Sequence, residues 1–385
     1  MTRIHGLDLA RALAIIGMMA AHMGPEHFLI DGYPSALFAV LSGVSMGIIA
    51  SRSAGLAQAR AALLTRAVIL VGLGVVLSAV QFSIAIVLTA IGVSFLLLLP
   101  VLAWRTRWQV VLLAALVILG PLIGAAQAAL FIPWTSAFFT DLLFGSYPLT
   151  AWLTYTLLGL LIHRLALQRE TWLLLGGLVV FGLVQGILQV TGLRQSPGDM
   201  LNFVGEWLQG EPHSGGLLDV LTSAGLVAAI IGACLLACRV VAIVWATYPL
   251  RCLGAMSLTV YVVHVVITSI ANGTFLGAGD NLAMLPDKEM GTLSDHGVAG
   301  ADVGWTMEPL PDSPDLGFPP PDMDMAYPLW PSMFFAQLVG FLVFTSLWRW
   351  KFRRGPAEWA VSRAVTGTVS PRVDLEPARS TLSRP

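Results

Sequence analysis

Long stretches without any Asp, Glu, Lys or Arg constrain this chain more than any other feature. Such runs cover residues 67–104, 108–140, 171–193, 220–238, 252–279 and 325–348. A helix needs about 20 mainly apolar residues to cross a bilayer, so each run can hold one span, and 67–104 can hold two with a turn near 81–83. The composition agrees, because 56% of the residues are apolar and only 11% are charged, against roughly 25% in soluble domains.

We therefore expect an all-α polytopic membrane protein, a bundle of about ten transmembrane helices. The expected helices lie near residues 9–27, 34–51, 66–81, 84–104, 108–127, 149–163, 171–190, 217–238, 253–271 and 328–348. Basic residues orient such a bundle, because cytosolic loops carry the excess of Lys and Arg. With both termini cytosolic, the basic residues of the connecting segments fall on the inner side except Arg194 and Lys288.

Two segments differ from the rest of the chain. Within the expected membrane domain, residues 1–348, the segment 272–327 is rich in proline and holds ten acidic residues against the single Lys288. We expect it to be an outer loop with little regular structure, either a solvated cap or a lid over an outer entrance. The basic tail, residues 349–385, suits a cytosolic helix on the anionic inner leaflet, with disorder at its end.

Several kinds of site find no support in the sequence. Cys234, Cys238 and Cys252 lie near the inner ends of expected helices, where we interpret them as small apolar core residues rather than metal ligands. The chain has no phosphate-cradling glycine loop and no nucleophile elbow. Its basic surface is the inner rim, which is typical of membrane contact rather than nucleic-acid binding. We therefore expect no metal and no nucleic-acid partner.

The first expected helix carries ionisable residues that a lipid-facing helix avoids. Arg11 and His22 are eleven residues apart, which is three turns plus about 20°, so they share a face and lie about 16 Å apart along the axis. Asp8 precedes Arg11 by three residues and can pair with it, and Glu26 can orient His22. Each residue also has a simpler interpretation, because Arg11 can snorkel to the inner surface and His22 can be a hydrogen-bonded core histidine.

A second polar stripe lies on the expected helix 253–271. Ser257, Tyr261, His264 and Thr268 are spaced by four, three and four residues, which places them on one continuous face. Hydroxyl groups in this arrangement often only join neighbouring helices. A buried histidine on the same face, as on the first helix, favours a functional role for the stripe.

The second expected helix has the small-residue pattern that allows close helix packing. Gly43 and Gly47 are four residues apart, with Ser42 and Ser45 beside them. We expect this face to pack against the first helix. Ser42 is a weaker candidate for the wall of a cavity.

Several segments together resemble a known family. The stretch GLDLARALAIIGMMAAHM (6–23) resembles the opening of bacterial membrane proteins related to heparan-alpha-glucosaminide N-acetyltransferase, including an actinobacterial group of unknown function. The spacing of Arg11 and His22 also resembles the signature of O-antigen-acetylase-type membrane acyltransferases. Further similar segments, in order, are LFAVLSGVS (37–45), LGAMSLTVYVVH (253–264) and RRGPAEW (353–359).

The resemblance implies a bundle of ten or eleven helices that takes an acyl group, usually acetyl, from cytosolic acyl-CoA and delivers it to a sugar hydroxyl or amine outside. It implies that His22 is the catalytic residue. The donor would be acetyl-CoA or another acyl-CoA, and the acceptor a sugar, glycan or glycolipid. The expected location is the plasma membrane of a bacterium, multi-pass in the lipid bilayer, where the chain could form a homodimer.

On this hypothesis His22 acts as general base on the acceptor or carries the acyl group itself. His264 and Tyr261 would hydrogen-bond the acceptor or the developing oxyanion. The cations expected to hold the CoA phosphates or the thioester end are Arg11, Arg66 and Arg251. A transporter or flippase of a small polar or lipid-linked solute would use the same stripes as a binding path, and a structural envelope protein would use them as interhelical contacts. Periodicity alone does not separate the enzyme from the transporter.

Overall fold

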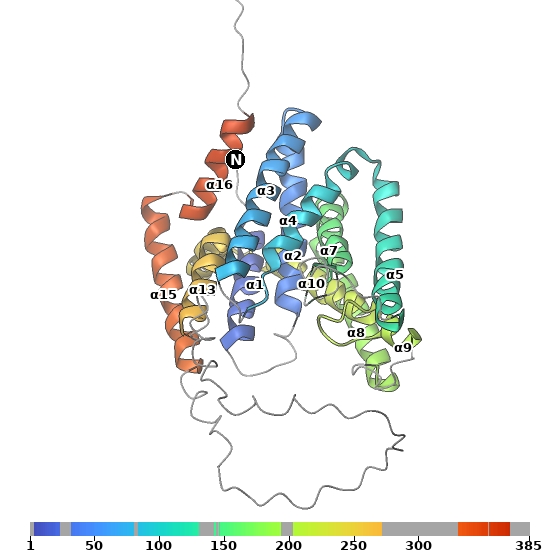
Figure 1. Ribbon diagram of the computed structural model, residues 1–385. Coiled ribbons are helices and arrows are strands. Elements are labelled where there is room, and N and C mark those ends of the chain that lie inside the picture. The colour runs from blue at the N-terminus through green and yellow to red at the C-terminus, as the bar shows by residue number, and fades with distance from the viewer. Residues whose placement is uncertain are drawn as a thin grey trace, which may run out of the picture.

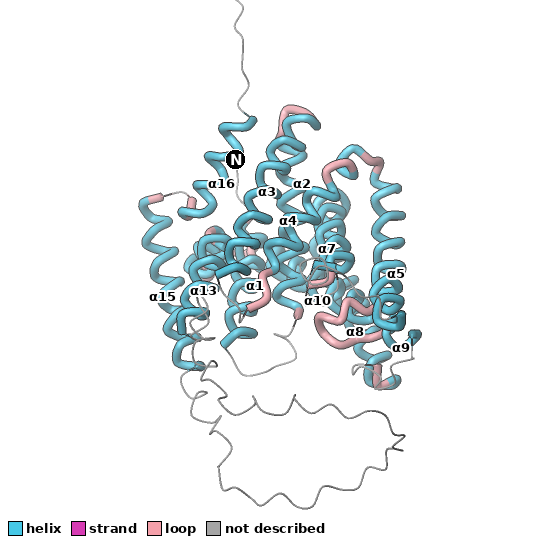
Figure 2. The backbone as a smooth tube through the Cα atoms, viewed as in Figure 1, coloured by secondary structure: helices cyan, strands magenta, loops and turns pink. Residues whose placement is uncertain are grey.

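The protein is entirely helical over the part of the chain that can be described. The computed structural model describes residues 4–23, 32–80, 84–130, 142–143, 145, 147–193, 203–271, 330–352 and 354–369. These residues form 14 α-helices and no strand (Figures 1 and 2). Eight of the described helices are long and apolar enough to cross a membrane, and nine spans result if one bent pair counts as a single span. The all-α polytopic membrane fold expected from the sequence is confirmed.

The ten expected helices appear in order with shifted ends, one of them is broken in two, and α9 and α11 are short helices that the sequence did not predict. In the first half they are α1 (His5–Met23), α2 (Tyr33–Arg52), α3 (Leu56–Val80), α4 (Val87–Leu98), α5 (Thr106–Leu130) and α7 (Leu149–Leu161). In the second half they are α8 (Glu170–Thr191), α9 (Phe203–Leu208), α10 (Leu217–Ala237), α11 (Val241–Ala246), α12 (Tyr248–Ala255), α13 (Ser257–Ala271), α15 (Trp330–Lys351) and α16 (Pro356–Val369).

Helices α1 and α2 lie at the centre of the bundle. Helix α1 contacts α2, α10, α12, α13 and α15, and in Figure 1 α5 and α15 lie at opposite edges of the molecule. More than half of α1 and α2 is buried inside the protein, whereas α3, α5 and α8 expose most of their apolar surface. Asp8, Arg11 and His22 of α1 are therefore wholly or partly enclosed by other helices, which lowers the cost of keeping them in a membrane.

Helices α3 and α4 differ in length from the sequence expectation. Helix α3 begins at Leu56 rather than 66, and α4 covers Val87–Leu98 rather than 84–104. Arg60 lies within α3, and its Nε donates a 3.1 Å hydrogen bond to the carbonyl oxygen of Leu99 just beyond α4. Carbonyl groups at a helix end lack intrahelical partners, so this arginine joins α3 to the end of α4.

The prediction of one continuous helix over 253–271 is wrong. The chain breaks at Met256, and α12 and α13 meet at an angle of 81°. The first backbone N–H groups of α13 donate hydrogen bonds to a side chain of α16. Oε1 of Glu358 accepts from the nitrogen of Leu258 at 2.8 Å and from that of Thr259 at 3.1 Å. The carboxylate on α16 thus caps a helix that begins inside the bundle.

The glycine face of α2 packs closely, but against α7 rather than α1. A Cβ atom on Gly43 would lie 1.9 Å from the carbonyl oxygen of Thr156, and one on Gly159 would lie 1.9 Å from that of Val40. Gly47 faces His163 in the same way. The small-residue pattern therefore predicted the close approach correctly and its partner helix wrongly, because spacing within one helix does not identify the neighbour.

Candidate functional site

His22 of α1 and His264 of α13 meet inside the bundle, although 242 residues separate them. The Nδ1 atom of His22 lies 3.1 Å from Nε2 of His264, and the two rings are parallel within 5°. His264 is 1% exposed, whereas His22 is only half-buried. The two histidines that the sequence singled out on separate helices therefore form one hydrogen-bonded pair.

Gln337 of α15 continues this pair into a chain of three side chains. Its Oε1 lies 2.9 Å from Nδ1 of His264. The amide nitrogen of Gln337 and the hydroxyl of Thr268 each donate to the sulfur of Met23 at 3.4 Å, which keeps the Gln337 oxygen turned toward the histidine. The hydroxyl of Thr268 also lies 3.2 Å from Nδ1 of His264.

The chain of contacts determines which nitrogen of each ring carries a hydrogen. An amide oxygen only accepts hydrogen bonds, so Nδ1 of His264 is the donor and its Nε2 keeps the lone pair. His22 must then donate from Nδ1 to that lone pair. The lone pair of neutral His22 is consequently on Nε2, the nitrogen that points away from His264.

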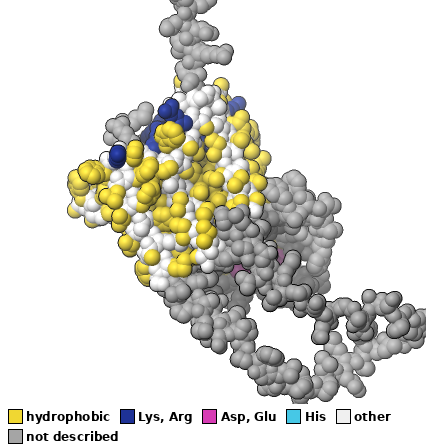
Figure 3. Space-filling view, turned by 60° about the vertical axis from the view of Figure 1, so that its left-hand side comes forward, with side chains coloured by type: hydrophobic (Ala, Val, Ile, Leu, Met, Phe, Trp, Pro, Cys, Tyr) yellow, Lys and Arg dark blue, Asp and Glu magenta, His cyan; other side chains and the backbone are white. Residues whose placement is uncertain are grey.

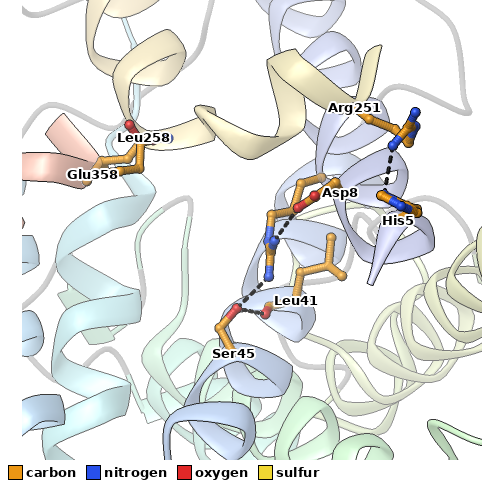
Figure 4. Close-up of polar contacts among 8 residues, drawn as sticks. His5, Asp8, Leu41, Ser45, Arg251, Leu258 and Glu358 are labelled. Atoms are coloured by element: carbon orange, nitrogen blue, oxygen red, sulfur yellow. Dashed lines mark hydrogen bonds and ion pairs between the residues drawn. The ribbon is translucent and has the colours of Figure 1, made fainter. Parts of the chain in front are cut away.

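Arg11 is the centre of a second polar network on the same face of α1, and Figure 4 labels its two partners, Asp8 and Ser45. Its guanidinium bonds Oδ1 of Asp8 at 3.0 Å and the hydroxyl of Ser45 on α2 at 2.9 Å. The expected pairing of Asp8 with Arg11 is confirmed, and Asp8 is 2% exposed. Arg11 therefore joins α1 to α2 instead of snorkelling to the end of the bundle.

A cavity of about 380 Å³ opens beside this network. Four residues that the sequence proposed for the site line it, namely Arg11, Ser42, Arg66 and Ser257. They come from α1, α2, α3 and the start of α13. Arg354, in the connection just before α16, and Glu358 of α16 complete the wall. The cavity therefore forms only when both ends of the chain are packed against the bundle.

Two other predicted site residues lie away from this cavity. Arg251 is buried and contacts Nδ1 of His5 at 2.7 Å (Figure 4). It also donates a hydrogen bond to the carbonyl oxygen of Val244. Tyr261 is buried against Phe38, with ring centroids 6.3 Å apart. Its hydroxyl lies near the backbone of Val87 but makes no hydrogen bond of normal geometry with the described residues. Arg251 thus has a structural contact, and Tyr261 does not bond the histidine pair.

The cavity and the histidine pair are neighbours along α13. Leu258 lines the cavity, and His264 follows it by six residues, which is about 9 Å along a helix axis. Tyr261 lies between Leu258 and His264 on α13, and its ring stacks on that of Phe38, which lines the cavity. This aromatic pair therefore lies between the cavity and the histidines. A long, thin ligand entering the cavity would have to pass this aromatic pair to reach His22.

Three residues of the site were missed by sequence reasoning, and three predictions lie outside the described residues. Gln337 is an amide in an otherwise apolar run, which is the signal that could have revealed it. Arg354 and Glu358 belong to the segment RRGPAEW, which the sequence predicted only as part of the resemblance and of a tail helix on the inner leaflet. Glu26, proposed to orient His22, the acidic segment 272–327 and the end of the tail, 370–385, fall outside the described residues.

Fold and geometry together define a polytopic helical membrane protein with a buried histidine pair and an arginine-lined cavity. Among the described residues, no group of three or more His, Cys, Asp or Glu side chains is arranged to hold a metal ion. No model of a known protein family and no curated protein matches this chain. Its chemistry has to be argued from the site itself.

Proposed function

We propose that the protein is a membrane acyltransferase that moves an acyl group, acetyl in the first instance, from acyl-CoA to a sugar or glycolipid acceptor across the bilayer. The hydrogen-bonded chain from Gln337 through His264 to His22 carries this proposal. Acyl transfer needs a group that can attack a thioester or deprotonate a hydroxyl near neutral pH, and a neutral imidazole with an oriented lone pair can do either.

Both roles use the same atom, Nε2 of His22. As a general base, it would take the proton of the acceptor hydroxyl or amine while the acceptor attacks the thioester carbonyl, and the departing CoA thiolate would take that proton back. As an acyl carrier, it would attack that carbonyl itself and expel the CoA thiolate. The acceptor would then take the acyl group from the imidazole, and its proton would pass to the thiolate, which completes CoA. In both cases His264 would accept a hydrogen bond from Nδ1 of His22 and stabilise the positive charge that develops on the ring.

The arginine-lined cavity supports acyl-CoA as the donor. Its cations suit phosphate groups, and the donor's long pantetheine arm would cover the remaining distance to His22. Lys and Arg side chains gather at the upper end of the face in Figure 3, above a mainly apolar surface. The positive-inside rule makes this end the cytosolic one in our proposal, in the plasma membrane of a bacterium.

The test is transfer of labelled acetyl from acetyl-CoA to envelope glycans and lipids by the purified protein. We expect His22→Ala to reduce turnover at least 10²-fold, which is the typical contribution of a general base. His163→Ala is the matched control, because His163 is half-buried and packs against Gly47 rather than near His22. Turnover by His22→Ala equal to that of wild type would end the proposal. An acetyl group found on His22 by mass spectrometry would select the acyl-carrier route.

One observation favours a second candidate, a transporter of a small polar or lipid-linked solute. Helices α12 and α13 form a broken pair beside a polar cavity, and many transporters bind substrate at discontinuous helices. A transporter would show solute flux into proteoliposomes without acyl-CoA. An acyltransferase would release CoA in step with acceptor acylation.

A further inference from the structure

The arginine-lined cavity has more arginine side chains than there are carboxylates in or beside its wall. Arg11, Arg66 and Arg354 line it, and the neighbouring acids are Asp8, which pairs with Arg11, and Glu358. Glu358 is already engaged, because its oxygens accept hydrogen bonds from the backbone of Leu258 and Thr259 and from the Thr259 hydroxyl at 2.6 Å. Arg66 and Arg354 therefore remain without a carboxylate partner among the described residues.

Arg66 is the residue of this wall whose polar atoms most require a partner. Its Nε is buried and has no hydrogen-bond partner among the described residues. The guanidinium is also close enough to Arg354 for their charges to interact. Arg66 is half-buried and Arg354 is exposed, and an anion bound between these like charges would offset their repulsion. The planar guanidinium groups would hold a phosphate with several hydrogen bonds at once.

The position of Arg354 is fixed by the docking of α16. Its carbonyl oxygen accepts a 2.9 Å bond from Nε1 of Trp348, and its guanidinium bonds the hydroxyl of Ser362. Helix α16 is attached to α13 through Glu358 and to α3 through a 2.9 Å contact between the hydroxyls of Thr65 and Thr368. This segment follows α15, yet it completes the wall of a cavity that is lined mainly by α1, α2, α3 and the region where α12 meets α13.

We propose that Arg11, Arg66 and Arg354 form a binding site for a phosphate-bearing ligand, closed on one side by α16. The cavity, at about 380 Å³, is within the range of small-molecule sites. Two ligands share the required chemistry, the phosphates of CoA and the phosphate headgroup of a lipid. The choice of CoA rests on the proposed function, whereas the phosphate site rests on the charges and contacts described above.

The experiment measures phosphate-ligand binding separately from acyl transfer. The full chain is placed in nanodiscs of phosphatidylcholine, and the binding of CoA and of inorganic pyrophosphate is followed by calorimetry. In a second arm, phosphatidylglycerol is added to the nanodiscs, and lipid retained by the protein is measured by native mass spectrometry. We expect Arg66→Gln and Arg354→Gln each to raise the Kd for CoA at least tenfold. Arg363→Gln, on the exposed side of α16, is the control and should change it less than twofold.

The outcomes separate the ligand sources. CoA and pyrophosphate binding that depends on Arg66 and Arg354 identifies a soluble phosphate ligand. Phosphatidylglycerol retained by the wild type and lost from both variants, without CoA binding, identifies a lipid phosphate at the same site. The proposal is overturned if the wild type binds none of the three ligands. It is also overturned if both variants bind them as tightly as the wild type does.

Two further readouts keep this result independent of folding and of catalysis. In the absence of ligand, Arg66→Gln should unfold at the same temperature as wild type or higher, because it removes a repulsion; a variant that fails to fold contradicts the charge argument. His22→Ala should bind CoA normally. Arginine-dependent CoA binding without any acyl transfer by the wild type would leave the site standing and refute the proposed function.

Discussion

At the scale of single residues, the site follows from the need of buried polar atoms for partners. His264 is almost fully enclosed, and both of its ring nitrogens have hydrogen-bond partners. Those partners determine which ring nitrogens carry hydrogen, so the side-chain amide of Gln337 on α15 fixes the position of the lone pair of His22 on α1. Gln337 is in this sense a positioning residue, since it reaches His22 only through His264.

Replacing Gln337 with Leu removes the acceptor that holds His264 in the required tautomer. By analogy with other residues that orient a histidine, we expect kcat for acyl transfer to fall about 10–100-fold. The KM for acyl-CoA should stay within twofold, because Gln337 does not line the cavity. Steady-state kinetics measure both quantities. Gln337→Glu keeps an acceptor oxygen and should recover part of kcat, and equal loss in both variants would contradict the tautomer argument.

Gly43 tests the close packing of α2 on α7. A Cβ atom at this position would meet a backbone carbonyl, which cannot move without shifting α7, so Gly43→Ala should destabilise the protein by about 1–3 kcal/mol. Gly72→Ala is the control, because no atom lies within 4 Å of the added carbon. Thermal unfolding in mild detergent gives the comparison, and equal stability of the two variants would exclude the contact.

At the scale of elements, the break between α12 and α13 depends on a carboxylate from α16. A helix that begins inside a bundle leaves its first N–H groups without intrahelical partners, and Glu358 supplies acceptors for two of them. Gly355 permits this approach, because a Cβ there would lie 2.3 Å from Oε2 of Glu358. The tail helix and the bent span therefore stabilise each other.

Glu358→Ala should release α16 from the bundle. Loss of a helix cap costs about 0.5–2 kcal/mol, and the amides of Leu258 and Thr259 lose their acceptor. We expect faster hydrogen exchange over 356–369 and at the start of α13. Glu170→Ala is a suitable control, since it removes a carboxylate whose partner, Arg239, is exposed, and such surface pairs contribute little. Unchanged exchange over α16 in Glu358→Ala would show that the helix is held by other contacts.

At the scale of the whole molecule, the orientation in the membrane is a prediction from charge distribution. Cytosolic loops retain Lys and Arg, which places the end of the bundle that includes α16 inside the cell. A cysteine at Ser380 in the tail should then be cytosolic, and one at Ser196, between α8 and α9, should be outside.

Labelling with a membrane-impermeant maleimide measures this orientation. In a background lacking Cys234, Cys238 and Cys252, we expect Ser196→Cys to react in intact cells and Ser380→Cys only after the membrane is opened. The reverse pattern would place the arginine-lined cavity outside. Acyl-CoA could then not reach it from the cytosol, and the proposed donor would be excluded.

The sequence by itself determined that this is a helical membrane protein, where its spans lie and which helices carry polar stripes. It could do so because apolar run length and helical periodicity are local properties. It also paired Asp8 with Arg11, since three residues along a helix fix their proximity.

Only the tertiary structure decided which stripes face one another. The meeting of His22 with His264, the contribution of Gln337 and the packing of α2 on α7 depend on how separate helices are arranged. The carboxylate that caps α13 at the break after Met256 comes from Glu358 of α16, 100 residues along the chain from Leu258. The third arginine of the cavity, Arg354, comes from the segment just before that helix. Contacts of this kind follow from packing and from the partners that buried polar groups require, and no local pattern in the sequence encodes either.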